Sequence, residues 1–148
     1  MQVFWPSSID MSEMVIPDLQ GSVVCEDVRM EMNGAQTLVG VINAVIAPQV
    51  PVRLLKFCIW TRWCSGFGKF RQRARILTPD EEKVVCENQI EFQLNNMETH
   101  ATNVHFFTGI QFDNYGVYHV EIQLEQDMKL RYPLCVTNPP NVPPSAMV

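Results

Sequence analysis

Residues 110–124 read IQFDNYGVYHVEIQL, and this stretch decides the fold. From Tyr118 onward, apolar residues alternate with more polar ones, which predicts a strand with one face in a core. The apolar face consists of Tyr118, Val120, Ile122 and Leu124. The preceding Asn114-x-Gly116-x-Tyr118 pattern is typical of the tyrosine corner of immunoglobulin-like sandwiches, in which the phenol oxygen bonds to nearby backbone. We therefore expect an all-β fold, an immunoglobulin-like antiparallel β-sandwich.

The composition fits a single soluble domain. The chain has 148 residues, of which 47% are hydrophobic and 18% charged, and its net charge is −5. No apolar run approaches the roughly 18 residues of a membrane span, and the first residues lack the basic and apolar regions of a signal peptide. We expect a cytoplasmic protein that does not contact a membrane. Met11 is a second candidate for its first residue.

The five cysteines indicate a reducing environment. Their number is odd, and no two of them have the two-residue spacing of metal knuckles or redox motifs. Antibody domains carry a disulfide cysteine two residues after the corner tyrosine, where this chain has Val120. We expect all five to be reduced packing residues and predict no metal and no cofactor.

Alternating runs predict seven to nine strands, and no window has helical periodicity. The eight runs cover residues 24–32, 36–47, 52–64, 70–77, 84–94, 104–112, 118–124 and 128–136. Asn33-Gly34 predicts a hairpin with a type I′ turn, and the near-continuous apolar run 36–47 predicts a central strand. We expect an arm at residues 1–20, the sandwich at 21–136 and a proline-rich tail at 137–148.

The chain resembles a family of small uncharacterised bacterial proteins known only as a domain of unknown function. The resemblance rests on a Val-Cys-Glu-like first strand, Leu38-Val39-Gly40-Val41, the Phe112 to Tyr118 segment and the Pro133 to Val136 segment, and covers about residues 23–136. It implies a β-sandwich. It implies no activity, cofactor or catalytic residue.

Charge segregation is the strongest functional signal. Seven of the eleven Lys and Arg residues lie between Arg53 and Arg75, a segment without Asp or Glu. If the turn 65–68 closed a hairpin, Cys64 would lie opposite Lys69 and one outer face would gather the basic residues. That predicted binding face consists of Lys56, Trp60, Arg62, Arg71, Arg73 and Arg75, with Trp60 across from Arg73. It is either a solvated face balanced by Glu87 and Glu91 or a docking surface for an anionic partner.

The sequence favours an interaction module over an enzyme. Hydrolase nucleophile motifs and phosphate-binding glycine loops are absent. His105 and His119 are predicted too far apart to share a metal. A buried pocket that holds two or more convergent polar side chains with perturbed pKa values would contradict the non-catalytic assignment, and Cys64, Cys86 and His105 are the first candidates for such a pocket.

We expect binding to an acidic protein surface or self-association. The alternative is a small-molecule, carbohydrate or single-stranded nucleic-acid binder, and a pocket lined by Trp60 or Trp63 would favour a small ligand. Nucleic acid is the less favoured partner because the chain is acidic overall.

Overall fold

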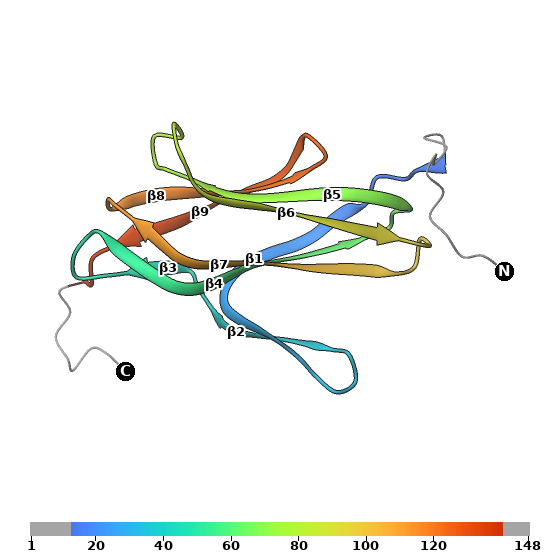
Figure 1. The fold of residues 1–148 in the computed structure, drawn as a ribbon, viewed down its shortest axis with the longest axis horizontal. Coiled ribbons are helices and arrows are strands. Elements are labelled where there is room, and N and C mark those ends of the chain that lie inside the picture. Colours follow the sequence, from blue (N-terminus) through green and yellow to red (C-terminus); the bar gives the residue numbers. More distant parts are fainter. Residues whose placement is uncertain (1–12, 141–148) are drawn as a thin grey trace.

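Nine strands form two packed sheets in the computed structural model, which describes residues 13–140 (Figure 1). Sheet 1 has four strands, in the order β2 (Gln36–Val41), β1 (Asp18–Met30), β4 (Val52–Cys64) and β7 (His100–Phe112). Sheet 2 has five, in the order β3 (Ala44–Ile46), β9 (Asp127–Thr137), β8 (Gly116–Leu124), β5 (Gly68–Leu77) and β6 (Val84–Leu94). All pairs are antiparallel except β3 with β9. The predicted β-sandwich is confirmed, and residues 13–140 contain no helix long and apolar enough to cross a membrane.

The tyrosine corner is present where the chain passes from sheet 1 to sheet 2. The Tyr118 hydroxyl donates to the Asn114 carbonyl at 2.9 Å, and the Asn114 amide donates to the Tyr118 hydroxyl oxygen at 3.3 Å. Gly116 has φ +143°, and a Cβ there would lie 2.8 Å from Cγ of Pro79. Glycine is therefore required at this position for both conformation and space. The corner fixes the start of β8, whose alternating residues enter the core.

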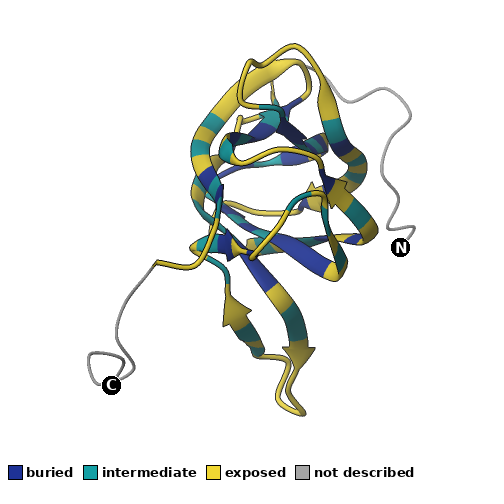
Figure 2. Ribbon diagram, turned by 90° about the vertical axis from the view of Figure 1, so that its left-hand side faces the viewer, coloured by how far each residue is buried: buried dark blue, intermediate teal, exposed yellow. Residues whose placement is uncertain are grey.

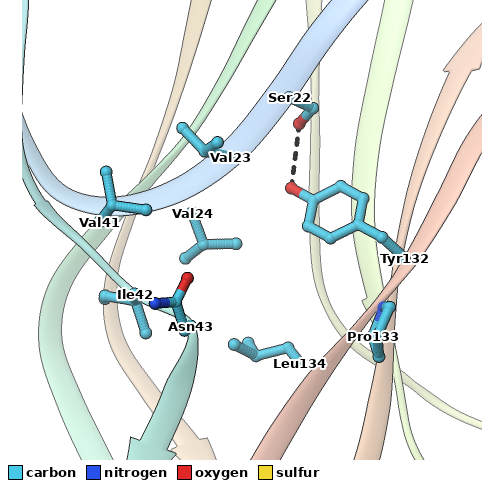
Figure 3. A pocket seen from close by; sticks show the side chains of 9 residues that line it. All are labelled: Ser22, Val23, Val24, Val41, Ile42, Asn43, Tyr132, Pro133 and Leu134. Atoms are coloured by element: carbon cyan, nitrogen blue, oxygen red, sulfur yellow. Dashed lines mark hydrogen bonds between the residues drawn. The ribbon is translucent and has the colours of Figure 1, made fainter.

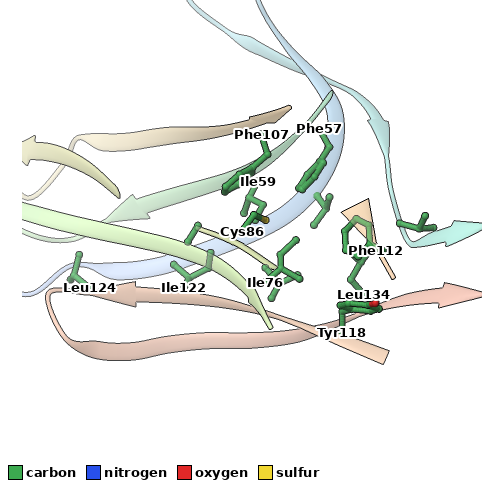
Figure 4. Packing of buried hydrophobic residues seen from close by; sticks show 14 of the residues in the cluster. Phe57, Ile59, Ile76, Cys86, Phe107, Phe112, Tyr118, Ile122, Leu124 and Leu134 are labelled. Carbon is green, nitrogen blue, oxygen red and sulfur yellow. The ribbon is translucent and has the colours of Figure 1, made fainter. Parts of the chain in front are cut away.

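The core lies between the two sheets and is built from the faces that alternation predicted (Figure 4). Phe57 and Ile59 of β4 are fully buried, as are Val120 and Ile122 of β8. Phe112 packs edge-on against Tyr118 with the ring centroids 5.0 Å apart. Tyr118 itself is 2% exposed, which confirms its predicted burial.

The expected hairpin between residues 52–64 and 70–77 is wrong. β4 belongs to sheet 1 and β5 to sheet 2, so the turn 65–68 crosses between sheets. Both strands direct their apolar faces into the same core from opposite sides, and alternation alone cannot distinguish this from pairing side by side. The crossing is held by Val15, which exchanges backbone hydrogen bonds with Phe67.

The expected central strand at residues 36–47 is also wrong. The segment divides into β2 and β3, which lie at the edges of opposite sheets. Its apolar side chains contact two sheets in succession, and both Val41 and Ile46 are at least half exposed. A near-continuous apolar run therefore arose from a change of sheet rather than from burial on both faces.

The hairpin at Asn33-Gly34 is confirmed, with Met30 opposite Gln36. Its turn differs from the type I′ expectation, since Gly34 has φ +88° while Asn33 does not have a positive φ. Instead, Oδ1 of Asn33 accepts from the amide of Ala35 at 3.0 Å.

The ends of the sandwich differ slightly from the expected boundaries. β1 already begins at Asp18, and the contact of Val15 with Phe67 attaches part of the segment that was expected to be a loose arm. The final strand continues to Thr137. The rest of the predicted arm and tail, residues 1–12 and 141–148, lies outside the described residues.

Candidate functional site

The six predicted binding residues do not form one surface. Lys56, Trp60 and Arg62 lie on the outer face of β4 in sheet 1, and Arg71, Arg73 and Arg75 lie on the outer face of β5 in sheet 2. The core separates the two sets, so Trp60 cannot contact Arg73 as expected. The single basic face was wrong because it depended on the hairpin between β4 and β5.

The arginine row of sheet 2 is occupied by partners within its own sheet. Arg71 lies 3.5 Å from a carboxylate oxygen of Glu91, as one of the two interpretations predicted. Arg75 Nε donates to Glu121 at 2.8 Å, and Glu121 is only 4% exposed. With the Gln89 amide turned so that its oxygen faces Arg73, the guanidinium donates to it at 2.6 Å. These contacts leave the row little free charge for a partner.

The second half of β1 and β2 form a hairpin, residues 26–41, that partly covers the outer face of sheet 1. We call this hairpin the arm from here on; it is distinct from the segment 1–20 that was expected to be a loose arm. Trp60 lies opposite Val23, but its indole Nε1 donates to Gln36 Oε1 at 2.8 Å. Gln36 lies opposite Met30, which is far from Val23 along β1. The hydrogen bond between Trp60 and Gln36 therefore requires β1 to bend back across the outer face of sheet 1. Figures 1 and 2 show the arm leaving the sandwich, with an exposed tip.

An ion pair fixes the base of the arm. Nζ of Lys56 lies 2.9 Å from Oδ1 of Asp27. The hydrogen bond lowers the pKa of Asp27 and raises that of Lys56, so both remain charged at neutral pH. Beneath the bend of β1, Cys58 is fully buried although it lies on the outer face of β4, away from the core. The arm thus shields one half of the outer face.

The other half of this face exposes an aromatic side chain among few charges. Phe106 of β7 is 52% exposed, and Nζ of Lys56 lies 5.4 Å from the centroid of its ring. β7 contains no Asp, Glu, Lys or Arg. We call Lys56, Trp60, Arg62 and Phe106 the sheet-1 patch.

A cluster of polar side chains is buried between the sheets around Gln72 of β5. Its Oε1 accepts from Trp63 Nε1 at 2.6 Å and from Asn103 Nδ2 at 2.7 Å. Its Nε2 donates to Nε2 of His105, 2.8 Å away, and Nδ1 of His105 bonds to Oδ1 of Asn88. Thr61, which is fully buried, bonds to Gln72 as well.

These contacts define the state of His105. With Nε2 accepting from Gln72, the ring proton sits on Nδ1 and is donated to Asn88. Burial lowers the pKa of His105 to about 4, so the ring is neutral at pH 7. Convergent polar groups with a shifted pKa also occur in active sites, but here each bonds to another member of the cluster. The arrangement links the two sheets through side-chain hydrogen bonds.

The remaining residues at which chemistry was considered do not converge. Cys64 lies opposite His100, not His105, and His119 lies on sheet 2. No group of three metal-ligating side chains occurs in residues 13–140. The five cysteines are free, with Cys25, Cys58 and Cys86 buried. Burial raises the pKa of Cys86 to about 12, which makes its thiol unreactive.

A small pocket of about 160 Å³ opens between β1 and β9 (Figure 3). Its polar end is the hydrogen bond between Ser22 Oγ and Tyr132 Oη, 2.9 Å long. Val24 and Leu134 form apolar walls. A cavity of about 150 Å³ can hold a benzene molecule, whereas sites for larger ligands measure roughly 300 to 1,000 Å³. Neither Trp60 nor Trp63 lines this pocket.

Two important residues were missed by sequence reasoning. Phe106 lies between the buried His105 and Phe107, so alternation applied to β7 would have placed it outward. Gln72 is a polar residue at an inward position of β5, and that violation of the pattern was the available signal for the buried cluster.

Comparison with known proteins adds a family but no activity. Residues 20–137 match the model of the Family of unknown function (DUF6941), a range that spans both sheets. Among curated proteins, the sequence has no significant match.

Proposed function

The chain belongs to this family of unknown function, and we propose that it is a non-catalytic interaction module that binds an acidic segment of a partner protein on the sheet-1 patch. The observation that carries the proposal is the exposed ring of Phe106 beside Lys56, with Arg62 further along the same outer face of β4. Exposed aromatic and arginine side chains are enriched where proteins bind one another. The charge of the patch complements an acidic partner.

Several features support the rest of the proposal. Each side chain of the Gln72 cluster hydrogen-bonds to another member of the cluster, which favours a structural role over catalysis. Five free cysteines favour a reducing compartment such as the cytoplasm. The tyrosine corner favours an immunoglobulin-like sandwich.

The test is an NMR titration with the acidic peptide EFEIE and its neutral counterpart QFQIQ. We expect amide shifts in β4 and β7 with EFEIE, weakened by salt. Phe106→Thr should reduce affinity about tenfold or more, since burying a phenylalanine ring contributes roughly 1.5 to 3 kcal/mol. Val117→Thr, which removes an exposed apolar side chain from sheet 2, is the matched control and should bind normally.

Other outcomes overturn the proposal. Shifts confined to sheet 2, or equal binding of both peptides, would exclude the patch as an acidic docking surface. Sedimentation velocity tests self-association in parallel. A dimer that Phe106→Thr abolishes would show that the occupant is a second copy of the chain instead of an acidic partner.

A further inference from the structure

Arg62 has unused hydrogen-bonding capacity. A guanidinium group has five N–H donors, yet among residues 13–140 the buried Nε of Arg62 has no hydrogen-bond partner. No described carboxylate forms an ion pair with Arg62 either, in contrast to Lys56 and Arg75. A buried donor without a partner costs free energy, and each such group in a folded protein calls for an explanation.

The neighbouring positions leave room for a ligand beside this cation. Directly opposite Arg62 on β1 stands Gly21, and a Cβ built there would meet nothing within 4 Å. On the other side, Arg62 is paired with the exposed Thr102 of β7. Directly opposite residues in a sheet share one face, so the open space lies on the same outer face as Arg62.

The charged groups around Arg62 indicate which class of ligand it binds. Lys56, the other cation of the patch, is already paired with Asp27. Binding of a nucleic-acid strand depends on neutralising several phosphates, and the single unpaired cation of the sheet-1 patch, in a chain of net charge −5, does not provide this. A single carboxylate matches a single guanidinium, which can hold it through two parallel hydrogen bonds.

We propose that Arg62 is the carboxylate-binding residue of the sheet-1 patch and receives a glutamate or aspartate side chain of the partner in the space above Gly21. The inference rests on the proposed function and adds its specificity. Phe106 contributes apolar contact, while Arg62 selects an acidic segment over a neutral one. The half-buried position of Arg62 strengthens the pairing because water screens it less than an exposed pair.

The experiment uses the full chain, the peptides EFEIE and QFQIQ, and the ¹⁵N resonances of the arginine side chains. The Nε–H signal of Arg62 should shift on addition of EFEIE and not of QFQIQ. Arg62→Met, which keeps the apolar stem, should weaken EFEIE binding about tenfold or more, and Arg62→Lys should bind with intermediate affinity. Arg71→Met on sheet 2 is the matched control and should bind as the unmodified chain does.

The outcomes separate this inference from the proposed function. If Phe106→Thr weakens EFEIE binding and Arg62→Met does not, the result supports the sheet-1 patch as the binding surface and refutes the role of Arg62. If neither change matters, or EFEIE does not bind, both are refuted. An Arg62-dependent complex with oligo(dT) in place of EFEIE would overturn the carboxylate assignment. Circular dichroism of each variant verifies that the sandwich is intact.

Discussion

Protonation of His105 should make the fold sensitive to mild acid. Burial holds the pKa of this ring at about 4, compared with an ordinary value of 6.5. Between these values the unfolded chain binds more protons than the folded one, so stability falls as the pH decreases through this window. From pH 7 to pH 5 the loss amounts to about 2 kcal/mol, and it reaches about 3 kcal/mol near pH 4.

The structure explains why the proton is excluded. Nε2 of His105 accepts from Gln72, and protonation there would place two donors against each other. The ring is fully buried, so water cannot replace the lost hydrogen bond. Carboxylates with lowered pKa values, such as Asp27, lose their stabilising contribution only at more acidic pH. Measurements between pH 7 and pH 5 therefore isolate the histidine.

The assay is urea denaturation at both pH values, followed by fluorescence. The unmodified chain should be about 2 kcal/mol less stable at pH 5, whereas His105→Gln should lose most of this difference, whatever its own stability at pH 7. His100→Gln, which removes an exposed imidazole, is the control and should retain it. An equal pH difference in the unmodified chain and His105→Gln would refute the reasoning.

Further experiments test the corner, the thiols and the outer face of sheet 2. Tyr118→Phe should lower stability by about 1 kcal/mol through one lost hydrogen bond, and an unchanged denaturation midpoint would contradict the corner. Iodoacetamide at pH 8 should modify Cys64 well before Cys86, whose pKa burial raises to about 12; equal rates in mass spectra would contradict that burial. Glu121→Gln should cost about 2 to 3 kcal/mol, because it leaves the half-buried Arg75 without a carboxylate partner. Glu91→Gln at an exposed pair should cost under about 1 kcal/mol, and similar losses for the two glutamate variants in urea would refute the difference.

Much of the local structure followed from the sequence. The predicted strands 52–64 and 84–94 coincide with β4 and β6, and the corner at Tyr118 forms the expected hydrogen bond. These features depend on alternation and on turn residues within a few positions of one another. Such signals are local, so they survive without knowledge of neighbouring strands.

The assembly of the sheets was decided only by tertiary structure. Alternation in β4 and β5 identifies the buried face of each strand, but the turn 65–68 can equally close a hairpin or cross between sheets. The crossing divides the basic residues between opposite faces, provides Glu121 as a partner for Arg75 and leaves Arg62 without one. The sequence determined which side chains turn outward, because period-two geometry belongs to each strand. The partners they meet depend on contacts between residues distant in the chain, and only the folded sandwich specifies those.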